Sequence, residues 1–301
     1  MNKKLFSLII IAVLGCYACK PETKKTSESW DEGQVSIVAD SNLKVVLEPL
    51  VTIYEHYFPK AKIDFQYASE DKVIQDFKQN NNNVIATNRL LDENELHNAA
   101  IAQGVTIGEY TFAYDAVAVI ANKDFKDSVF KIENISSILQ NKNIQLVFDN
   151  PKSGIARLLM QLSQTPATDF KNALALQSST DLLNYIAAHQ NAIGFIPFHL
   201  LSNNYENETQ YILNHFKVLN VSYKEVTTAI SQQSIADAKY PLIRPITIYI
   251  GRCSEQVIKG FTGFLLKRQI SKAILLSGLV PKNMPIRDVV VTDKFNPNGN
   301  K

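Results

Sequence analysis

Short runs of β-branched and aromatic residues alternate with amphipathic stretches along most of this chain, and the alternation constrains the fold more than any other feature. The first cycle runs from a β-type segment at 35–39, through an expected helix over 42–57, to a second β-type segment at 61–67. In the expected helix, apolar residues recur every three or four positions and form one face to pack on a sheet. Such alternation is typical of parallel sheets covered by helices on both faces. We therefore predict an α/β protein.

The alternation occurs twice, and a near-continuous β-type run separates the two sets. Residues 105–119 are mostly β-branched, aromatic and small apolar, so we predict one long or paired strand that leaves the first set. A second α/β set follows, with a polar, loop-like segment at 203–210, and a strand predicted over 246–250 leads back. Two such crossovers predict two lobes with a cleft between them. The predicted lobes are 34–118 with 246–301 for lobe 1, and 119–245 for lobe 2.

The N-terminus has the pattern of a bacterial secretory signal. Two lysines precede an apolar run over residues 5–14 that is too short to span a bilayer. The Val-Leu-Gly-Cys sequence at 13–16 resembles a lipobox, in which the cysteine is lipidated and becomes the new N-terminus. We therefore expect a signal peptide at 1–15 and a lipid anchor on Cys16, which holds the protein at a membrane without spanning it.

Two alternatives to lipidation at Cys16 stay open. Cys19 is the weaker candidate, because Cys16 and Tyr17 would then fill positions that normally hold an aliphatic and a small residue. The other alternative is an ordinary signal peptide cut near Ala18. Residues 16–33 are rich in Pro, Thr, Ser, Lys and Glu, which is typical of a flexible tether between an anchor and a fold.

Composition limits both the stabilising devices and the partners. The chain has 3 cysteines, so a lipidated Cys16 leaves no disulfide framework, and stability must come from a hydrophobic core. The chain has 31 Lys and Arg against 29 Asp and Glu, and loss of the signal peptide removes two lysines, which leaves a formally neutral protein. Neutrality argues against nucleic acid as a partner but allows one small anion in a local site. We expect a monomer.

The sequence lacks the residue constellations of common enzymes. The 5 histidines include no pair at i, i+4 spacing and no cysteine partner at metal-ligand spacing. Neither a Gly-rich phosphate loop of the Walker type nor a G-x-S-x-G turn occurs in the printed sequence. We therefore expect no catalytic residue, no metal and no cofactor, and we expect the histidines at the surface or at helix caps.

Three times, a β-type run ends in short polar residues immediately before an expected helix. These turns are at 40–42, 87–89 and 149–154. Backbone N–H groups at a helix N-terminus bind anions, and in parallel sheets such turns share the edge where ligands bind. Each turn taken alone is also an ordinary N-cap. The candidate ligand-binding residues are Ser41, Asn42, Thr87, Asn88, Arg89, Ser153, Gly154 and Arg157.

Charged residues near these turns have two possible roles. Arg89 and Arg157 offer bidentate donors to an oxyanion, or else form surface ion pairs. Asp115 is the least expected carboxylate because it interrupts an apolar stretch. In a cleft it would accept the proton of a hydrogen phosphate and reject sulfate; otherwise it caps a turn at the crossover.

Over residues 35–288 the chain resembles the phosphate-binding, type II periplasmic substrate-binding proteins of ABC transporters. The order and spacing of short segments carry the resemblance. The matching segments are 40–42, 87–89, 114–120 (Tyr-Asp-Ala-Val-Ala-Val-Ile), 138–142, 153–154, 192–195, 240–245 and 278–281. The resemblance implies two lobes, each a mainly parallel sheet flanked by helices, that close on phosphate. It also implies that amides and hydroxyls of Ser41, Asn42, Thr87, Ser153 and Gly154 hold the ligand, with an inner-membrane permease as partner.

Two positions depart from the family pattern: Asp149 stands where the family often has an arginine, and Ile155 where it has a threonine. Either Arg89 or Arg157 compensates for the missing groups, or the ligand differs from phosphate.

We expect a periplasm-facing or cell-envelope lipoprotein that captures inorganic phosphate for ABC-type import. One alternative is a lipoprotein that binds or senses another oxyanion, such as sulfate or molybdate, without a dedicated permease. A secreted phosphate-ester hydrolase is the less favoured alternative.

Overall fold

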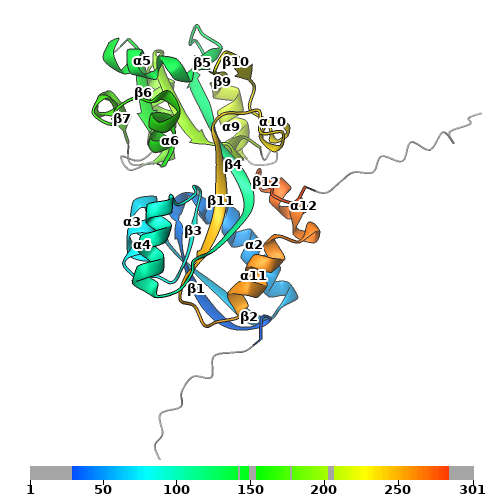
Figure 1. Cartoon of the computed structure of the whole chain (residues 1–301). Coiled ribbons are helices and arrows are strands. Elements are labelled where there is room, and N and C mark those ends of the chain that lie inside the picture. The colour runs from blue at the N-terminus through cyan, green and yellow to red at the C-terminus, as the bar shows by residue number, and fades with distance from the viewer. Residues whose placement is uncertain (1–28, 142, 149–153, 177, 203–206, 285–301) are drawn as a thin grey trace, which may run out of the picture.

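The protein has two lobes connected by two long strands (Figure 1). The computed structural model describes residues 29–141, 143–148, 154–176, 178–202 and 207–284, and the statements below concern these residues. The predicted α/β class and the two-lobed arrangement are confirmed. Among the described helices, none is long and apolar enough to cross a membrane.

The first lobe contains the N-terminal elements and the last helices. Its elements before the crossover are β1 (Glu32–Asp40), η1 (Ser41–Leu43), α2 (Lys44–Tyr57), β2 (Lys60–Ala68), α3 (Glu70–Lys78), β3 (Val84–Thr87) and α4 (Glu93–Gln103). Strand β4 (Gly108–Asn122) leads out of this lobe and β11 (Ile243–Ile250) leads back. The chain then forms α11 (Val257–Leu265), α12 (Arg268–Leu276) and β12 (Val280–Pro281).

The second lobe lies between β4 and β11 in the sequence. Its elements are β5 (Val129–Lys131), η2 (Ile132–Asn134), α5 (Ile135–Asn141), β6 (Gln145–Phe148), α6 (Gly154–Ser163), η3 (Asp169–Asn172), β7 (Leu174–Ala175), α7 (Ser179–Ala188), β8 (Ala192–Pro197), α8 (His199–Ser202), α9 (Asn207–His215), β9 (Phe216–Tyr223), β10 (Val226–Thr228) and α10 (Gln232–Ala236).

The strand order is β2-β1-β3-β11-β4-β8-β6-β7. Strand β1 pairs in parallel with β2 and β3, and β6 pairs in parallel with β7 and β8, while the two crossover strands β4 and β11 are antiparallel to each other. Residues 108–116 of β4 pair with β11, and residues 117–122 pair with β8 and β9. We propose that the lobes meet at this point, close to the predicted boundary at 118.

Each lobe has its own hydrophobic core. In lobe 1, the apolar face of α2 packs with β1 and α11, and Tyr54 is fully buried at its centre. In lobe 2, the second half of β4 packs with β6, β8 and α7. Both faces of β8 and of the second half of β4 are covered, which explains why their residues form continuous apolar runs in the sequence. The carboxyl ends of β1 and β3 and the start of α6 are thereby directed toward the space between the cores.

Two segments differ from the sequence prediction. Strand β1 begins at Glu32, and the Trp30 ring packs edge-on against Phe58, so the end of the predicted tether lies on the fold. Residues 207–210, predicted as part of a loop, begin helix α9. This helix is polar overall, and Thr209 and Ile212 supply its buried face, which is too narrow to stand out in the sequence.

Candidate functional site

A cavity of about 460 Å³ lies where the two lobes face each other. Lobe 1 contributes the turn after β3 and the start of α4, lobe 2 contributes the first two turns of α6, and β11 forms a further wall. The lining residues are Asn88, Arg89, Leu90, Leu91, Asp92, Glu95, Gly154, Arg157, Leu158, Gln161, Ile243, Arg244 and Pro245. The cavity lining therefore combines charged and amide side chains from both lobes with apolar residues.

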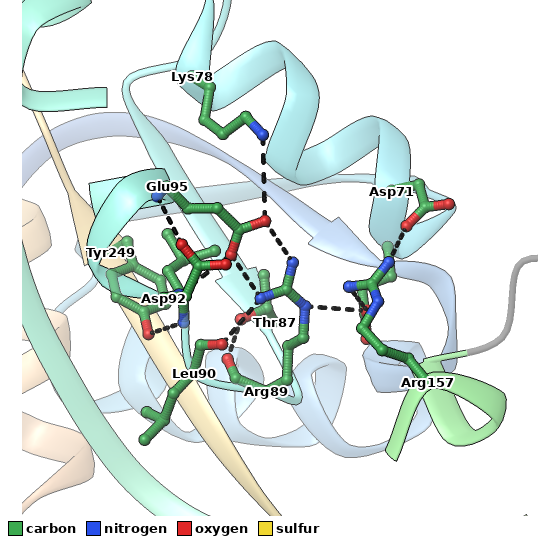
Figure 2. A network of polar contacts seen from close by, with 11 residues as sticks. Asp71, Lys78, Thr87, Arg89, Leu90, Asp92, Glu95, Arg157 and Tyr249 are labelled. Atoms are coloured by element: carbon green, nitrogen blue, oxygen red, sulfur yellow. Dashed lines mark hydrogen bonds and ion pairs between the residues drawn. The ribbon is translucent and has the colours of Figure 1, made fainter. Parts of the chain in front are cut away.

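The carboxylate of Glu70, the first residue of α3, is the centre of the polar contacts next to this cavity. Glu70 is 4% exposed. Its Oε1 atom accepts from Arg89 Nε at 3.2 Å and from Arg157 Nη1 at 3.2 Å. A second contact joins Arg157 Nη2 to Asp71 Oδ1 at 2.5 Å, and Figure 2 shows Arg157 reaching from α6 toward the helix that carries Asp71. Arg157 therefore connects the two lobes across the cleft.

Asn88 supplies a third donor to the same carboxylate. It is 1% exposed and lies in the turn after β3. With its amide nitrogen facing the carboxylates, Asn88 donates to Glu70 Oε2 at 3.0 Å and to Asp40 Oδ2 at 3.3 Å, and its oxygen accepts from Arg244 Nη1 at 2.8 Å. One side chain thus joins the ends of β1 and β3 to the crossover strand β11.

Arg89 is held in place by the N-terminus of α4. Its Nη1 and Nη2 atoms each donate to Glu95 at 2.7 Å, which leaves Nε for Glu70. Asp92 and Glu95 form a capping box on α4, which fixes the carboxylate that receives Arg89 (Figure 2). Burial alone would raise the pKa of Glu95, but the hydrogen bonds and charge of Arg89 outweigh burial and lower it.

Gly154 lets the start of α6 approach Glu70 closely. A Cβ atom at this position would lie 2.2 Å from Glu70 Oε2, a separation that real Cβ contacts do not show. The glycine therefore permits close approach, and the group it admits in this structure is the side-chain carboxylate of Glu70.

Replacing Gly154 with alanine is expected to lower the free energy of unfolding by about 1–3 kcal/mol, because the new methyl group displaces the paired carboxylate of Glu70. Thermal unfolding measures the change. Gly263→Ala is the matched control, because Gly263 is exposed in α11 and a methyl group added there would have nothing within 4 Å of it. An equal effect of the two substitutions would show that Gly154 has no special contact.

Asp115 lies on the crossover strand β4, opposite Arg244 of β11 in the register of the two strands. The two side chains are buried, and Arg244 Nη2 donates to Asp115 Oδ2 at 3.1 Å. His199 Nδ1 lies 3.5 Å from the same oxygen. Burial alone would raise the pKa of Asp115, but the contact with His199 and the charges of His199 and Arg244 outweigh burial and lower it.

This placement corrects two predictions. Asp115 is in the middle of a strand, so the interpretation as a turn cap is wrong, and Asp115 is not among the described residues that line the cavity. It supports Arg244, which does line the cavity. His199 is buried at the start of α8, so of the two predicted placements, at the surface or at a helix cap, the surface one is wrong at this position. Its ring is covered because α8 packs against β4 and β8.

The structure brings together part of the predicted site. Asn88, Arg89, Gly154 and Arg157 all line the cavity. Ser153 and the rest of the turn at 149–153 lie outside the described residues, as does Cys16.

The other predicted residues have local roles in the described structure. The Ser41 hydroxyl is exposed and donates to the carbonyl of Ala68, and the Asn42 backbone N–H donates to Asp40 Oδ1. The buried Thr87 hydroxyl donates to the carbonyl of Arg89 and so closes its own turn. The Asn42 and Thr87 contacts match the ordinary N-cap and turn interpretation, whereas the Ser41 hydroxyl contacts the end of β2. The cavity lining among described residues does not include the three side chains.

Two residues at the site were not found from the sequence. Glu70 follows β2 in a fourth strand-to-helix turn, and its sequence signal is weak because an acidic residue in the first turn of a helix is common. Arg244 lies in the segment 240–245, which matched the family pattern but was not selected as a ligand contact. Within the described ranges, no group of three or more His, Cys, Asp or Glu side chains is placed to hold a metal ion.

Comparison with known protein families identifies the family of this chain. The model of the PBP superfamily domain matches residues 25–269. The chain belongs to this family. A search of curated protein sequences found no match.

Solved structures share the fold of this family member at low sequence identity. An ABC-type phosphate transport receptor from Vibrio cholerae has 20% identity and a TM-score of 0.64, covering 83% of this chain and 100% of its own. A Clostridium perfringens protein assigned as a phosphate ABC transporter substrate-binding protein, with bound phosphate, has 17% identity, a TM-score of 0.66 and the same coverage. The sulfate-bound regulatory domain of OxyR2 from Vibrio vulnificus has 10% identity, a TM-score of 0.52 and coverage of 79% and 97%. Transport and regulatory proteins therefore share this fold, and the site must decide the function.

Proposed function

We propose that this protein is an extracytoplasmic solute-binding protein that captures inorganic phosphate between its lobes for ABC-type import. The observation that carries the proposal is the convergence of Arg89, Arg157 and Asn88 on one carboxylate at the cavity. Guanidinium and amide donors that hold a carboxylate also fit the oxygens of phosphate. The similarity to two phosphate-transport proteins supports the choice of anion.

The geometry suits capture of an ion from water. The donors come from both lobes, so a ligand that contacts Arg89 and Arg157 together stabilises the closed arrangement. The cavity walls include the apolar residues Leu158, Ile243 and Pro245, which exclude water and strengthen charged contacts. No chemical step is required, and we propose binding without catalysis. A chromogenic phosphatase assay checks this point, with no turnover expected.

The N-terminal sequence supports the proposed compartment. The signal and lipobox at 1–16 would export the chain and anchor it through Cys16, with an ABC permease in the inner membrane as its partner. Radiolabelled palmitate is expected to label the wild-type protein, and Cys16→Ala is expected to abolish the label. Equal labelling of the two proteins would show that the lipid is attached elsewhere, with Cys19 as the alternative site.

Isothermal titration tests the choice of ligand. The purified protein is first dialysed free of anions, then titrated separately with phosphate, sulfate and molybdate. We expect saturable binding of phosphate and weaker binding of the other two. Preference for sulfate or molybdate would favour the alternative oxyanion, and an absence of binding to all three would contradict the proposal.

A further inference from the structure

We infer that Glu70 is a built-in occupant of the anion position: its carboxylate competes with the incoming ligand and joins the lobes when no ligand is bound. The inference rests on the proposed function for the identity of the displacing anion. The contacts between the lobes are independent of the proposed function.

The contacts of Glu70 are those of a bound ligand. Three donors reach its two oxygens, from the turn after β3 (Arg89 and Asn88) and from α6 in the other lobe (Arg157). The start of α6 lies against the same carboxylate, at Gly154. A carboxylate with this many donors occupies the position where they converge, and it excludes a second anion from that position.

The charges nearby favour displacement over joint binding. The Arg89 guanidinium contacts Glu70 and Glu95, and the Arg157 guanidinium contacts Glu70 and Asp71. Lys78 Nζ also lies 4.0 Å from Glu95 Oε1, so three positive charges are already matched by three carboxylates. A phosphate placed beside an undisturbed Glu70 would find no unmatched positive charge in this network, whereas a phosphate that replaces the Glu70 carboxylate would regain two guanidinium partners.

Glu70 is placed so that it can leave. It is the first residue of α3, and its carboxylate is at the end of a flexible side chain. The departure of this carboxylate removes one of the two contacts of Arg157 with lobe 1, and Asp71, whose side chain is 40% exposed, retains the other (Figure 2). A ligand that takes the place of Glu70 would restore the inter-lobe contact. Glu70 therefore sets both the affinity and the resting arrangement of the lobes.

Glu70→Gln tests the inference, because glutamine keeps the shape of the side chain and removes its charge. Small-angle X-ray scattering in anion-free buffer measures the radius of gyration, and titration calorimetry measures phosphate affinity. We expect the wild-type protein to be compact without phosphate. We expect the variant to be more expanded without phosphate, to become compact when phosphate is added, and to bind phosphate about tenfold more tightly, which corresponds to about 1.4 kcal/mol.

Asp76→Asn is the matched control. Asp76 is on the same helix, but its partner is Lys72 at the surface, so its loss removes one acidic charge from α3 without touching the cleft contacts. We expect this control to equal the wild type in both measurements.

Glu70→Asp serves as a second variant in case the glutamine variant does not fold. It withdraws the carboxylate by one methylene, and a smaller change in the same direction is expected.

The outcomes separate the inference from the proposed function. Glu70 variants that stay compact without phosphate and bind it no more tightly than wild type would overturn the inference. Weaker binding would also overturn it, since Glu70 would then be a ligand for phosphate and not its competitor. If the variant expands but neither protein binds an oxyanion, the contact between lobes is supported and the proposed function fails. If only the variant binds phosphate, the competition is supported.

Discussion

Replacing Asp115 with asparagine is expected to lower the free energy of unfolding by about 3 kcal/mol. The substitution leaves the guanidinium of Arg244 buried without its carboxylate, and breaking a buried ion pair from one side costs about 3–5 kcal/mol. The lower value is expected because Arg244 keeps its contact with Asn88. Urea unfolding at neutral pH measures the effect. A loss below about 1 kcal/mol, as for exposed ion pairs, would contradict the account.

The carboxyl group of Asp115 makes a pH-dependent contribution to the stability of the fold. The pKa of Asp115 is lowered in the folded protein, so its contribution to stability is fully present above the usual Asp pKa, near 3.9, and is lost as the pH falls through the lower folded value. The difference in stability between wild type and Asp115→Asn should therefore be constant at neutral pH and shrink below about pH 4. Replacing both partners, as in Asp115→Leu with Arg244→Met, is expected to recover much of the loss.

Arg89→Met is expected to have a comparable effect, a loss of about 3 kcal/mol, because it leaves two poorly exposed carboxylates, Glu70 and Glu95, without their shared partner. At roughly 2–4 °C per kcal/mol for a protein of this size, the melting temperature should fall by about 6–12 °C. Arg89→Lys should recover only part of this, because an ammonium group cannot reproduce the two-pronged contact with Glu95.

Lys72→Met is the control for Arg89→Met. Lys72 pairs with Asp76 on the exposed side of α3, and such surface pairs contribute about 0–1 kcal/mol. Scanning calorimetry of the two variants compares a cleft contact with a surface contact on the same lobe. Similar melting temperatures for the two variants would show that the Arg89 network does not stabilise the fold.

Local periodicity predicted most of the fold. The apolar positions of α2 repeat at helical spacing and are buried as expected, and α6 begins at Gly154, at the turn after which a helix was expected. The strands β4 and β11 were visible as apolar runs because they are covered on both faces. Helix α9 was missed because its buried face is short and its first residues are polar.

The site was predicted less completely, because its contacts join residues that are far apart in the chain. Glu70 and Arg157 are 87 positions apart, and Asp115 and Arg244 are 129 positions apart. The sequence identified turns with the right residue types, but it could not show that the Thr87 hydroxyl closes its own turn or that Arg89 faces two carboxylates. Which donors stay available to a ligand is decided by packing between lobes.

We expect an oxyanion to take the position now held by the Glu70 carboxylate. Arsenate is a tetrahedral analogue of phosphate, and its anomalous X-ray scattering locates it in a crystal of the complex. We expect one strong peak within hydrogen-bond distance of Asn88 and Arg157, with the Glu70 side chain turned away. A peak elsewhere, or a cleft in which Glu70 keeps its contacts at saturating arsenate, would contradict it.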